Sequence, residues 1–135
     1  MKKEIEIYSK IIIISMLLLL VIPLGSKLFA NGIFINNNTT VNISPNTIVK
    51  INGSLNVSGG ASFTQNGNIF ITGNWINNGN QTSSSGIVTF IGSESSFINS
   101  LSATSTQFYQ IILSKDNIND TLVIDVNTFN AINGF

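Results

Sequence analysis

Apolar and polar residues alternate along most of this chain in short runs that end at glycines. Alternation with a period of two is typical of a strand with one buried face, because successive side chains of a strand point to opposite sides. A weak form of the pattern, Val88-x-Phe90-x-Gly92, follows two longer copies that are separated by a constant offset. The longer copies are Val49-x-Ile51-x-Gly53-x-Leu55-x-Val57-x-Gly59 and Ile69-x-Ile71-x-Gly73-x-Trp75-x-Asn77-x-Gly79. The chain therefore contains a repeat of strand, turn and strand.

A constant offset predicts a parallel β-solenoid, in which each repeat winds one coil and equivalent side chains of successive coils lie about 4.8 Å apart. With about 20 residues per coil, residues 31–135 would form about five coils and a stack of roughly 24 Å. The asparagine-rich turns agree with this fold, because aligned amides can form hydrogen-bonded ladders between coils. The alternative is an antiparallel β-sandwich, which fits short strands but does not require a constant offset. Either fold is all-β.

A different pattern occupies residues 1–30. Two lysines lie near the start, an apolar run covers residues 11–24, and the segment ends at Ala30. A positive start, an apolar centre of about 14 residues and a small residue at the end are the three parts of a secretory signal. We therefore predict a signal helix that is cleaved between Ala30 and Asn31. An uncleaved anchor fits less well, because a spanning helix needs about 20 apolar residues and Pro23 interrupts this run.

The signal predicts where the chain goes and how it is divided. We expect export across the inner membrane, contact with the membrane only during export, and a secreted or cell-surface location. Residues 1–30 are then the signal peptide, and residues 31–135 form the solenoid segment. Residues 130–135 resemble the opening of another strand, so we expect this segment to be truncated at its C-terminus.

Charged side chains are few and unevenly placed. The chain has six lysines, no arginine and six acidic residues, and its formal net charge is zero. After residue 30 only two lysines and four acidic residues remain. The basic cluster that nucleic-acid binding needs is therefore missing, and we expect no nucleic-acid partner. This part of the chain instead carries 20 Asn, 14 Ser and 11 Thr, and their regular alternation with apolar residues favours a folded β protein over disorder.

The sequence contains no recognisable catalytic set. Cysteine and histidine are absent, which leaves the run Ser83-Ser84-Ser85 without an ordinary partner base, and we interpret this run as a flexible loop. The only grouped acids are Asp116, Asp120 and Asp125, whose spacing does not put all three on one strand face. We interpret them as solvated turn residues, with weak calcium binding by Asp116 and Asp120 as the alternative. We therefore expect no enzyme activity and no cofactor.

Aromatic side chains offer a candidate contact with glycans. Trp75 could form a platform for sugar rings together with a group of phenylalanines, namely Phe63, Phe70 and Phe90. Trp75 has the same phase as Leu55, however, so packing in the core is the favoured interpretation of this residue. Phe70 falls in the opposite phase, which predicts either an exposed contact or a strand covered on both faces.

Three motifs follow one another in the middle and second half of the chain. They are Ile71-Thr72-Gly73-Asn74-Trp75-Ile76-Asn77-Asn78-Gly79, Gly86-Ile87-Val88-Thr89-Phe90-Ile91-Gly92 and Phe108-Tyr109-Gln110-Ile111-Ile112-Leu113. This order resembles the repetitive segments of large secreted surface proteins of Bacteroidota-type bacteria, over roughly residues 47–126. Gln110 stands where that pattern more often has Asn. The resemblance implies a β-solenoid, a secreted or cell-surface location and an adhesin-like or stalk-like role, and it carries over no catalytic residue.

These patterns together predict a non-enzymatic structural or adhesive segment. Its stacked coils would present a neutral, amide-rich face to glycans or other cell-surface components. The alternative is a carbohydrate-binding module or a polysaccharide-lyase-like β-helix, which needs acidic or aromatic residues that converge on one groove. The sequence leaves the ligand and the oligomeric state open.

Overall fold

The computed structural model describes residues 32–101 and 106–134, and strands are the regular elements of these two ranges. The strands are β1 (Gly32–Ile35), β2 (Thr40–Ile43), β3 (Ile48–Ile51), β4 (Ser54–Val57), β5 (Ser62–Gln65), β6 (Asn68–Ile71), β7 (Trp75–Asn77), β8 (Asn80–Thr82), β9 (Ile87–Gly92), β10 (Ser96–Asn99), β11 (Thr106–Phe108), β12 (Gln110–Lys115), β13 (Leu122–Asp125) and β14 (Phe129–Ala131). In this part of the chain no helix has the length and apolar character needed to cross a bilayer. The predicted signal helix and the cleavage site between Ala30 and Asn31 lie outside the described residues.

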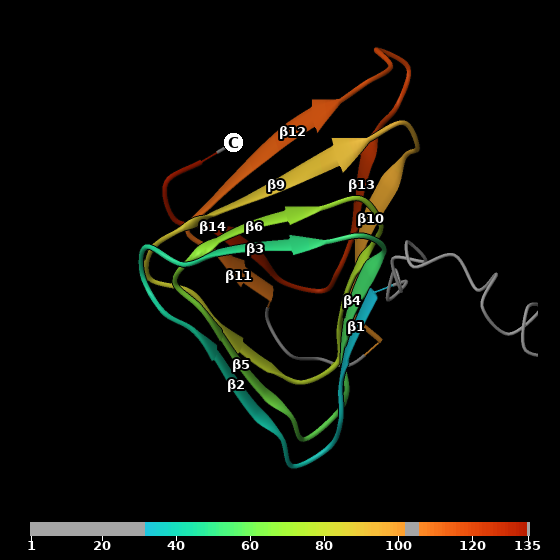
Figure 1. The fold of residues 1–135 in the computed structure, drawn as a ribbon. Helices are drawn as coiled ribbons and strands as arrows, with labels where there is room; N and C mark the ends of the chain where they lie inside the picture. Colours follow the sequence, from blue (N-terminus) through green and yellow to red (C-terminus); the bar gives the residue numbers. More distant parts are fainter. Residues whose placement is uncertain (1–31, 102–105, 135) are drawn as a thin grey trace, which may run out of the picture.

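The strands stack on three faces around a common interior (Figure 1). One face is sheet A, with the order β1-β4-β7-β10-β13, and a second is sheet C, with the order β12-β9-β6-β3. The third face has two parts, sheet B (β2-β5-β8) and sheet D (β11-β14). The chain visits the three faces in turn and then begins the next coil, so the fold is a β-solenoid.

The strand register stacks the residues that the sequence repeat aligned. Ile51 pairs with Ile71 and Ile71 with Phe90 in sheet C, and Leu55 pairs with Trp75 in sheet A. The predicted parallel β-solenoid is therefore confirmed. The antiparallel sandwich is wrong, because every strand pairing among the described residues is parallel.

Successive coils differ in length, so the constant offset expected from the sequence holds only for part of the chain. The offset between paired residues is 18 for Ser62 and Asn80 but 26 for Ser96 and Leu122. The spacing averages about 22 residues, and the described chain completes about four turns instead of the five expected. The longer coils place their extra residues in corners, such as residues 116–121 between β12 and β13. Corners can lengthen in this way because they leave the ladder pairing of the faces unchanged.

A column of aromatic side chains runs through the core from coil to coil. Trp75 is fully buried, and the centroid of its ring lies 5.8 Å from that of Phe63 and 5.0 Å from that of Phe108. Phe129 continues the column at 5.8 Å from Phe108. Aromatic pairs at such separations add about 0.5–1.5 kcal/mol beyond the area that they bury. Because the four rings come from four successive coils, the column holds neighbouring coils together.

Asparagine side chains also join neighbouring coils, but the bonds differ from the amide ladders expected from the sequence. Asn68 Oδ1 accepts a hydrogen bond from the backbone N–H of Ile87 at 3.0 Å. Asn78 Oδ1 accepts one from the backbone N–H of Leu101 at 2.8 Å. These asparagines lie at or next to the ends of strands, where the backbone ladder to the next coil stops. Their side chains satisfy backbone donors that the ladder leaves unpaired.

Glutamine side chains bridge a break in the third face, where β8 and β11 are neighbours in separate sheets. Gln81 Nε2 donates to the carbonyl of Gln107 at 2.6 Å, and Gln107 Nε2 donates to the carbonyl of Ser83 at 2.7 Å. Gln81 Oε1 also accepts the indole N–H of Trp75 at 3.1 Å. Gln81 therefore takes the place of strand pairing at this step and holds the core tryptophan in its orientation.

Gln81→Met tests this bridge. Methionine has about the volume of glutamine but leaves the Trp75 indole N–H and the Gln107 carbonyl without their partner, so we expect the free energy of unfolding to fall by about 1–3 kcal/mol. Gln110→Met, at the partly exposed start of β12, is the control and should change it by less than about 0.5 kcal/mol. Urea unfolding followed by tryptophan fluorescence gives both values. Equal losses in the two variants would contradict the bridge.

Candidate functional site

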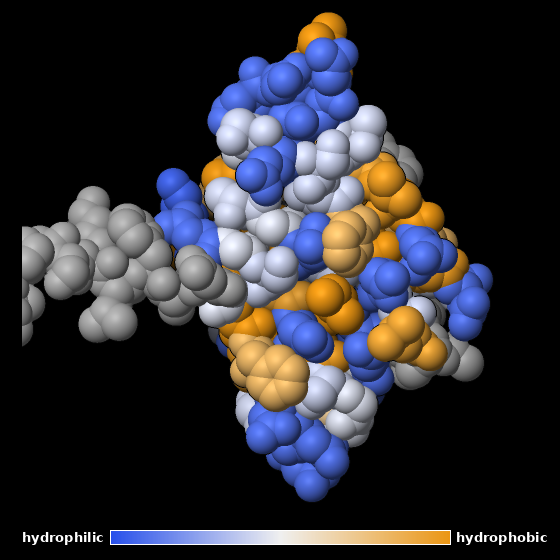
Figure 2. Space-filling model, turned by 90° about the vertical axis from the view of Figure 1, so that its right-hand side faces the viewer, coloured by the Kyte–Doolittle hydropathy of each residue, from blue (hydrophilic) through white to orange (hydrophobic). Residues whose placement is uncertain are grey.

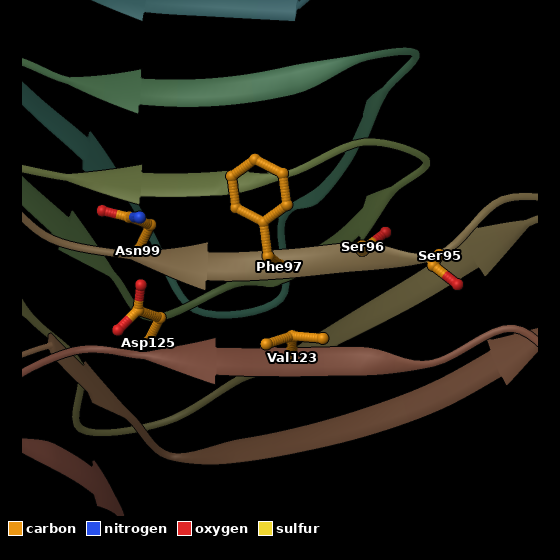
Figure 3. A pocket seen from close by; sticks show the side chains of 6 residues that line it. All are labelled: Ser95, Ser96, Phe97, Asn99, Val123 and Asp125. Carbon is orange, nitrogen blue, oxygen red and sulfur yellow. The ribbon is translucent and has the colours of Figure 1, made fainter.

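The outer face of sheet A carries a shallow hollow over strands β10 and β13. Its volume is about 330 Å³, and its lining residues are Ser95, Ser96, Phe97, Asn99, Val123 and Asp125 (Figure 3). Figure 2 shows this side of the molecule, on which apolar groups lie among polar ones. Ligand sites in proteins commonly have volumes of about 300–1,000 Å³. The hollow is therefore large enough for a small ligand group.

The apolar part of the hollow comes from two neighbours on adjacent strands. Phe97 in β10 pairs with Val123 in β13, and both side chains point outward because those of Ser96 and Ile98 point into the molecule and are buried. Phe97 is 40% exposed and Val123 is 54% exposed. Both side chains thus present apolar surface to solvent at paired positions. In Figure 3 the phenyl ring extends from β10 toward the neighbouring strand β7, where its face can meet a ligand.

The polar part of the hollow lies two residues further along both strands. Asn99 pairs with Asp125, and both are on the same outer side as Phe97 and Val123. Figure 3 shows the amide and the carboxylate near each other at one end of the hollow. Neither side chain is hydrogen-bonded to another residue in the described ranges. The donor and acceptors of the amide and the two carboxylate oxygens are therefore available to a ligand.

Asn74 fixes the backbone that carries Phe97. β7 begins at Trp75, so it has no strand residue opposite the backbone N–H of Phe97, and Asn74 Oδ1 accepts this N–H at 3.1 Å. The backbone N–H of Asn74 in turn donates to Ser54 Oγ at 3.0 Å. The side chains of Ser54 and Asn74 thus link three successive coils by hydrogen bonds just beyond the end of the backbone ladder. The backbone that carries Phe97 is therefore held in place without a ligand, which lowers the entropy cost of ordering this strand on binding.

Lys115 fixes the serine end of the hollow from the neighbouring corner. Its Nζ atom donates to Ser96 Oγ at 2.8 Å and to the carbonyl of Ile91 at 3.0 Å. Burial lowers the pKa of Lys115, while nearby carboxylates, of which Asp120 is the strongest, act in the opposite direction. The ammonium group is thus committed to contacts within the protein, and its role at this end is structural.

The aromatic platform, which was the less favoured interpretation of these residues, is not formed. Trp75, the candidate glycan contact, is fully buried, and so are Phe63 and Phe90. Their rings lie in the core, where no sugar ring can reach them. Phe70 does face outward with 36% exposure, but it belongs to β6 in sheet C, on a different face from the hollow. The interpretation of Trp75 as a core residue aligned with Leu55 is confirmed by their pairing.

The three grouped aspartates do not form one site. Asp116 and Asp120 lie in the corner between β12 and β13, whereas Asp125 ends β13 and lines the hollow. Asp120 is only partly exposed, and its Oδ2 atom is buried without a hydrogen-bond partner, so the expectation of a solvated turn residue is wrong for it. Among the described residues there is no group of three acidic, histidine or cysteine side chains that could hold a metal ion. Weak calcium binding by Asp116 and Asp120 alone therefore stays a prediction.

The serine run forms a hydrogen-bonded corner instead of the flexible loop expected from the sequence. Ser83 is buried, and its Oγ atom donates to Gln65 Oε1 at 2.9 Å and accepts the backbone N–H of Tyr109 at 3.2 Å. Ser84 donates from both its backbone N–H and its hydroxyl to Asn66 Oδ1. Since these bonds link three successive coils, the serines have a structural role.

The sequence reasoning missed Phe97 and Asn99 as site residues. The alternation of Ser96-Phe97-Ile98-Asn99 and that of Leu122-Val123-Ile124-Asp125 are both visible in the sequence. The step between these two segments is longer than the repeat that separates Ile51 from Ile71, however, so the sequence does not indicate that they pair. The alternation in β10 does predict that Phe97 faces outward, but it does not indicate which residues lie beside it.

Comparisons with known proteins do not identify a family. No family model matches the chain, and no curated protein or solved structure matches it either.

Proposed function

We propose that this chain is a non-enzymatic structural and adhesive segment of a secreted or cell-surface protein. The observation that carries the proposal is a parallel stack whose outside combines uncharged polar side chains with exposed apolar ones and carries the hollow on sheet A. Parallel ladders between coils favour a rigid body along the stack. The Asn, Gln, Ser and Thr side chains offer hydrogen bonds to glycans or other cell-surface components. In this mechanism the stack holds a binding face in a fixed orientation.

The N-terminal pattern supports the proposed location. A positive start, an apolar centre and the small residue Ala30 suit a cleaved signal, so Asn31 would be the first residue of the exported form. The membrane would then be a partner only during export. The resemblance of the three motifs to repetitive surface proteins of Bacteroidota-type bacteria supports the same location.

Expression of the full chain in a bacterial host tests location and adhesion in one experiment. We expect a product outside the cytoplasm whose mass corresponds to a start at Asn31. Beads coated with this product should be retained under flow on surfaces that carry cells or glycans, and beads coated with heat-unfolded product are the control. EDTA should change neither bead retention nor thermal unfolding, because no described group of three acidic, histidine or cysteine side chains suits a metal ion.

Two results would count against the proposal. Retention no better than that of the control beads on every surface would contradict the adhesive role and reduce the segment to a spacer. A product that stays in the cytoplasm with residues 1–30 attached would contradict the export signal.

Carbohydrate binding is the second function that a specific observation favours. The hollow joins an aromatic ring to hydrogen-bonding groups, and Asp125 is the only ionisable side chain in its lining. Lyase chemistry needs a base together with a group that stabilises the charge formed on the substrate. The lining therefore supports binding of a sugar better than it supports a polysaccharide-lyase-like activity.

A further inference from the structure

A ligand at the hollow can be bound only by the side chains of its lining, because the backbone there is already paired. β10, which carries Phe97, is paired with β7 on one side and β13 on the other. The ladders occupy its backbone donors and acceptors, so an extended peptide cannot join β10 as a further strand. A ligand of this surface must be recognised through the phenyl ring, the valine side chain and the polar pair beside them.

The order of these groups along the strands suits a sugar ring. Residues two apart on one side of a strand are separated by about 7 Å, so the polar pair lies about 7 Å along the strands from the apolar pair. This distance is close to the span of one hexopyranose ring with its hydroxyl groups. The C–H face of such a ring can pack on Phe97 and Val123. Its hydroxyl groups can then reach Asn99 and Asp125, which offer both donors and acceptors.

Charge at the hollow selects among sugars. The described residues include two lysines and four acidic residues, and the positive charge of Lys115 beside Ser96 is offset by the nearby carboxylates of Asp120, Asp116 and Glu94. An acidic sugar would bring its negative group near Asp125 without a lysine in the lining to balance it. The hydroxyl groups of a neutral sugar can instead donate to the carboxylate in charge-assisted hydrogen bonds.

We infer that the hollow over β10 and β13 binds a neutral sugar chain, with Phe97 and Val123 against the face of a ring and with Asn99 and Asp125 on its hydroxyl groups. The inference rests on the proposed adhesive function and specifies the class of ligand and the residues that bind it. The strand backbone of the site is preformed, since Asn74 holds the backbone of Phe97 in place.

Isothermal titration calorimetry of the full chain with dextran and a neutral galactan, and with alginate as the acidic comparison, tests the site. Phe97→Ala should weaken binding to the neutral polymer by at least about tenfold. Asp125→Ala should weaken it by about tenfold, because a charge-assisted hydrogen bond is lost. Alginate should bind more weakly than the neutral polymer. Phe34→Ala is the matched control, since Phe34 lies on the same outer side of sheet A, is 64% exposed and is outside the hollow, and it should change affinity by less than about twofold.

Other results of these measurements would contradict either the sugar site or the adhesive function. Equal losses for Phe97→Ala and Phe34→Ala, or unchanged binding for Phe97→Ala and Asp125→Ala, would overturn the site. Failure of both neutral polymers to bind would also overturn it, and if coated beads were still retained on cells the proposed adhesive function would stand. Sugar binding that depends on Phe97 without retention of the beads would support the site and contradict the adhesive function. The fluorescence of buried Trp75 shows whether each variant is folded.

Discussion

Trp75→Ala is expected to lower the free energy of unfolding by about 3–5 kcal/mol. The indole is fully buried, and it contacts Phe63 of the preceding coil and Phe108 of the following coil. Its removal would leave a cavity at the centre of the aromatic column. It would also leave Gln81 Oε1 without the indole N–H that it accepts. The loss therefore includes apolar contacts with two coils and one buried hydrogen bond.

Urea unfolding followed by circular dichroism measures this loss in a variant that has no tryptophan. Phe34→Ala is the control. It also removes an aromatic ring, but Phe34 is 64% exposed, so most of the surface that is lost is not buried in the core. We expect it to change the free energy of unfolding by less than about 0.5 kcal/mol. A loss below about 1 kcal/mol for Trp75→Ala would contradict the central place of this residue in the core.

The placement of Trp75 illustrates which part of the fold was predictable. Its phase in the repeat matched that of Leu55, and the two residues do pair in sheet A. Likewise, the step from Ile51 to Ile71 in the sequence repeat corresponds to one coil. A strand pattern that recurs at a fixed offset restricts the fold strongly, because only stacked coils bring all of its apolar positions together.

The candidate site was harder to predict because it depends on how coils of unequal length pair. Phe97 pairs with Val123 across a step of 26 residues, part of which residues 116–121 take up in the corner between β12 and β13. Sequence spacing does not indicate how long a corner can be while the ladders stay in register. The lining residues of the hollow therefore cannot be brought together without the strand pairing.

Side-chain hydrogen bonds were the second feature that the sequence did not specify. The abundance of asparagine suggested ladders between identical amides, whereas Asn68 accepts a bond from the backbone of Ile87 in the next coil. Ser83 similarly bonds with Gln65 on one side and Tyr109 on the other. The partner of a polar side chain depends on where each strand ends, and the pattern of apolar residues predicts strand ends poorly.

Glycines at the corners show most directly how closely the coils approach each other. Gly86 has a φ of 82° and lies in the corner that precedes β9. A Cβ atom at this position would be 2.2 Å from the carbonyl oxygen of Gly67 in the preceding coil. Gly92 has a similar φ of 91°, but a Cβ atom there would meet only the side chain of Thr72, at 3.6 Å. The two positions therefore share the backbone conformation and differ in the space around them.

Gly86→Ala is expected to lower the free energy of unfolding by about 2–5 kcal/mol. A positive φ costs an alanine about 1–2 kcal/mol, and the contact with a backbone oxygen adds about 1–3 kcal/mol because the coils must move apart. Gly92→Ala should lose only the first of these contributions, about 1–2 kcal/mol. Urea unfolding of both variants separates the two effects. Equal losses would mean that the corners can move apart at little cost, and the close stacking of Gly86 on Gly67 would then not limit how the coils pack.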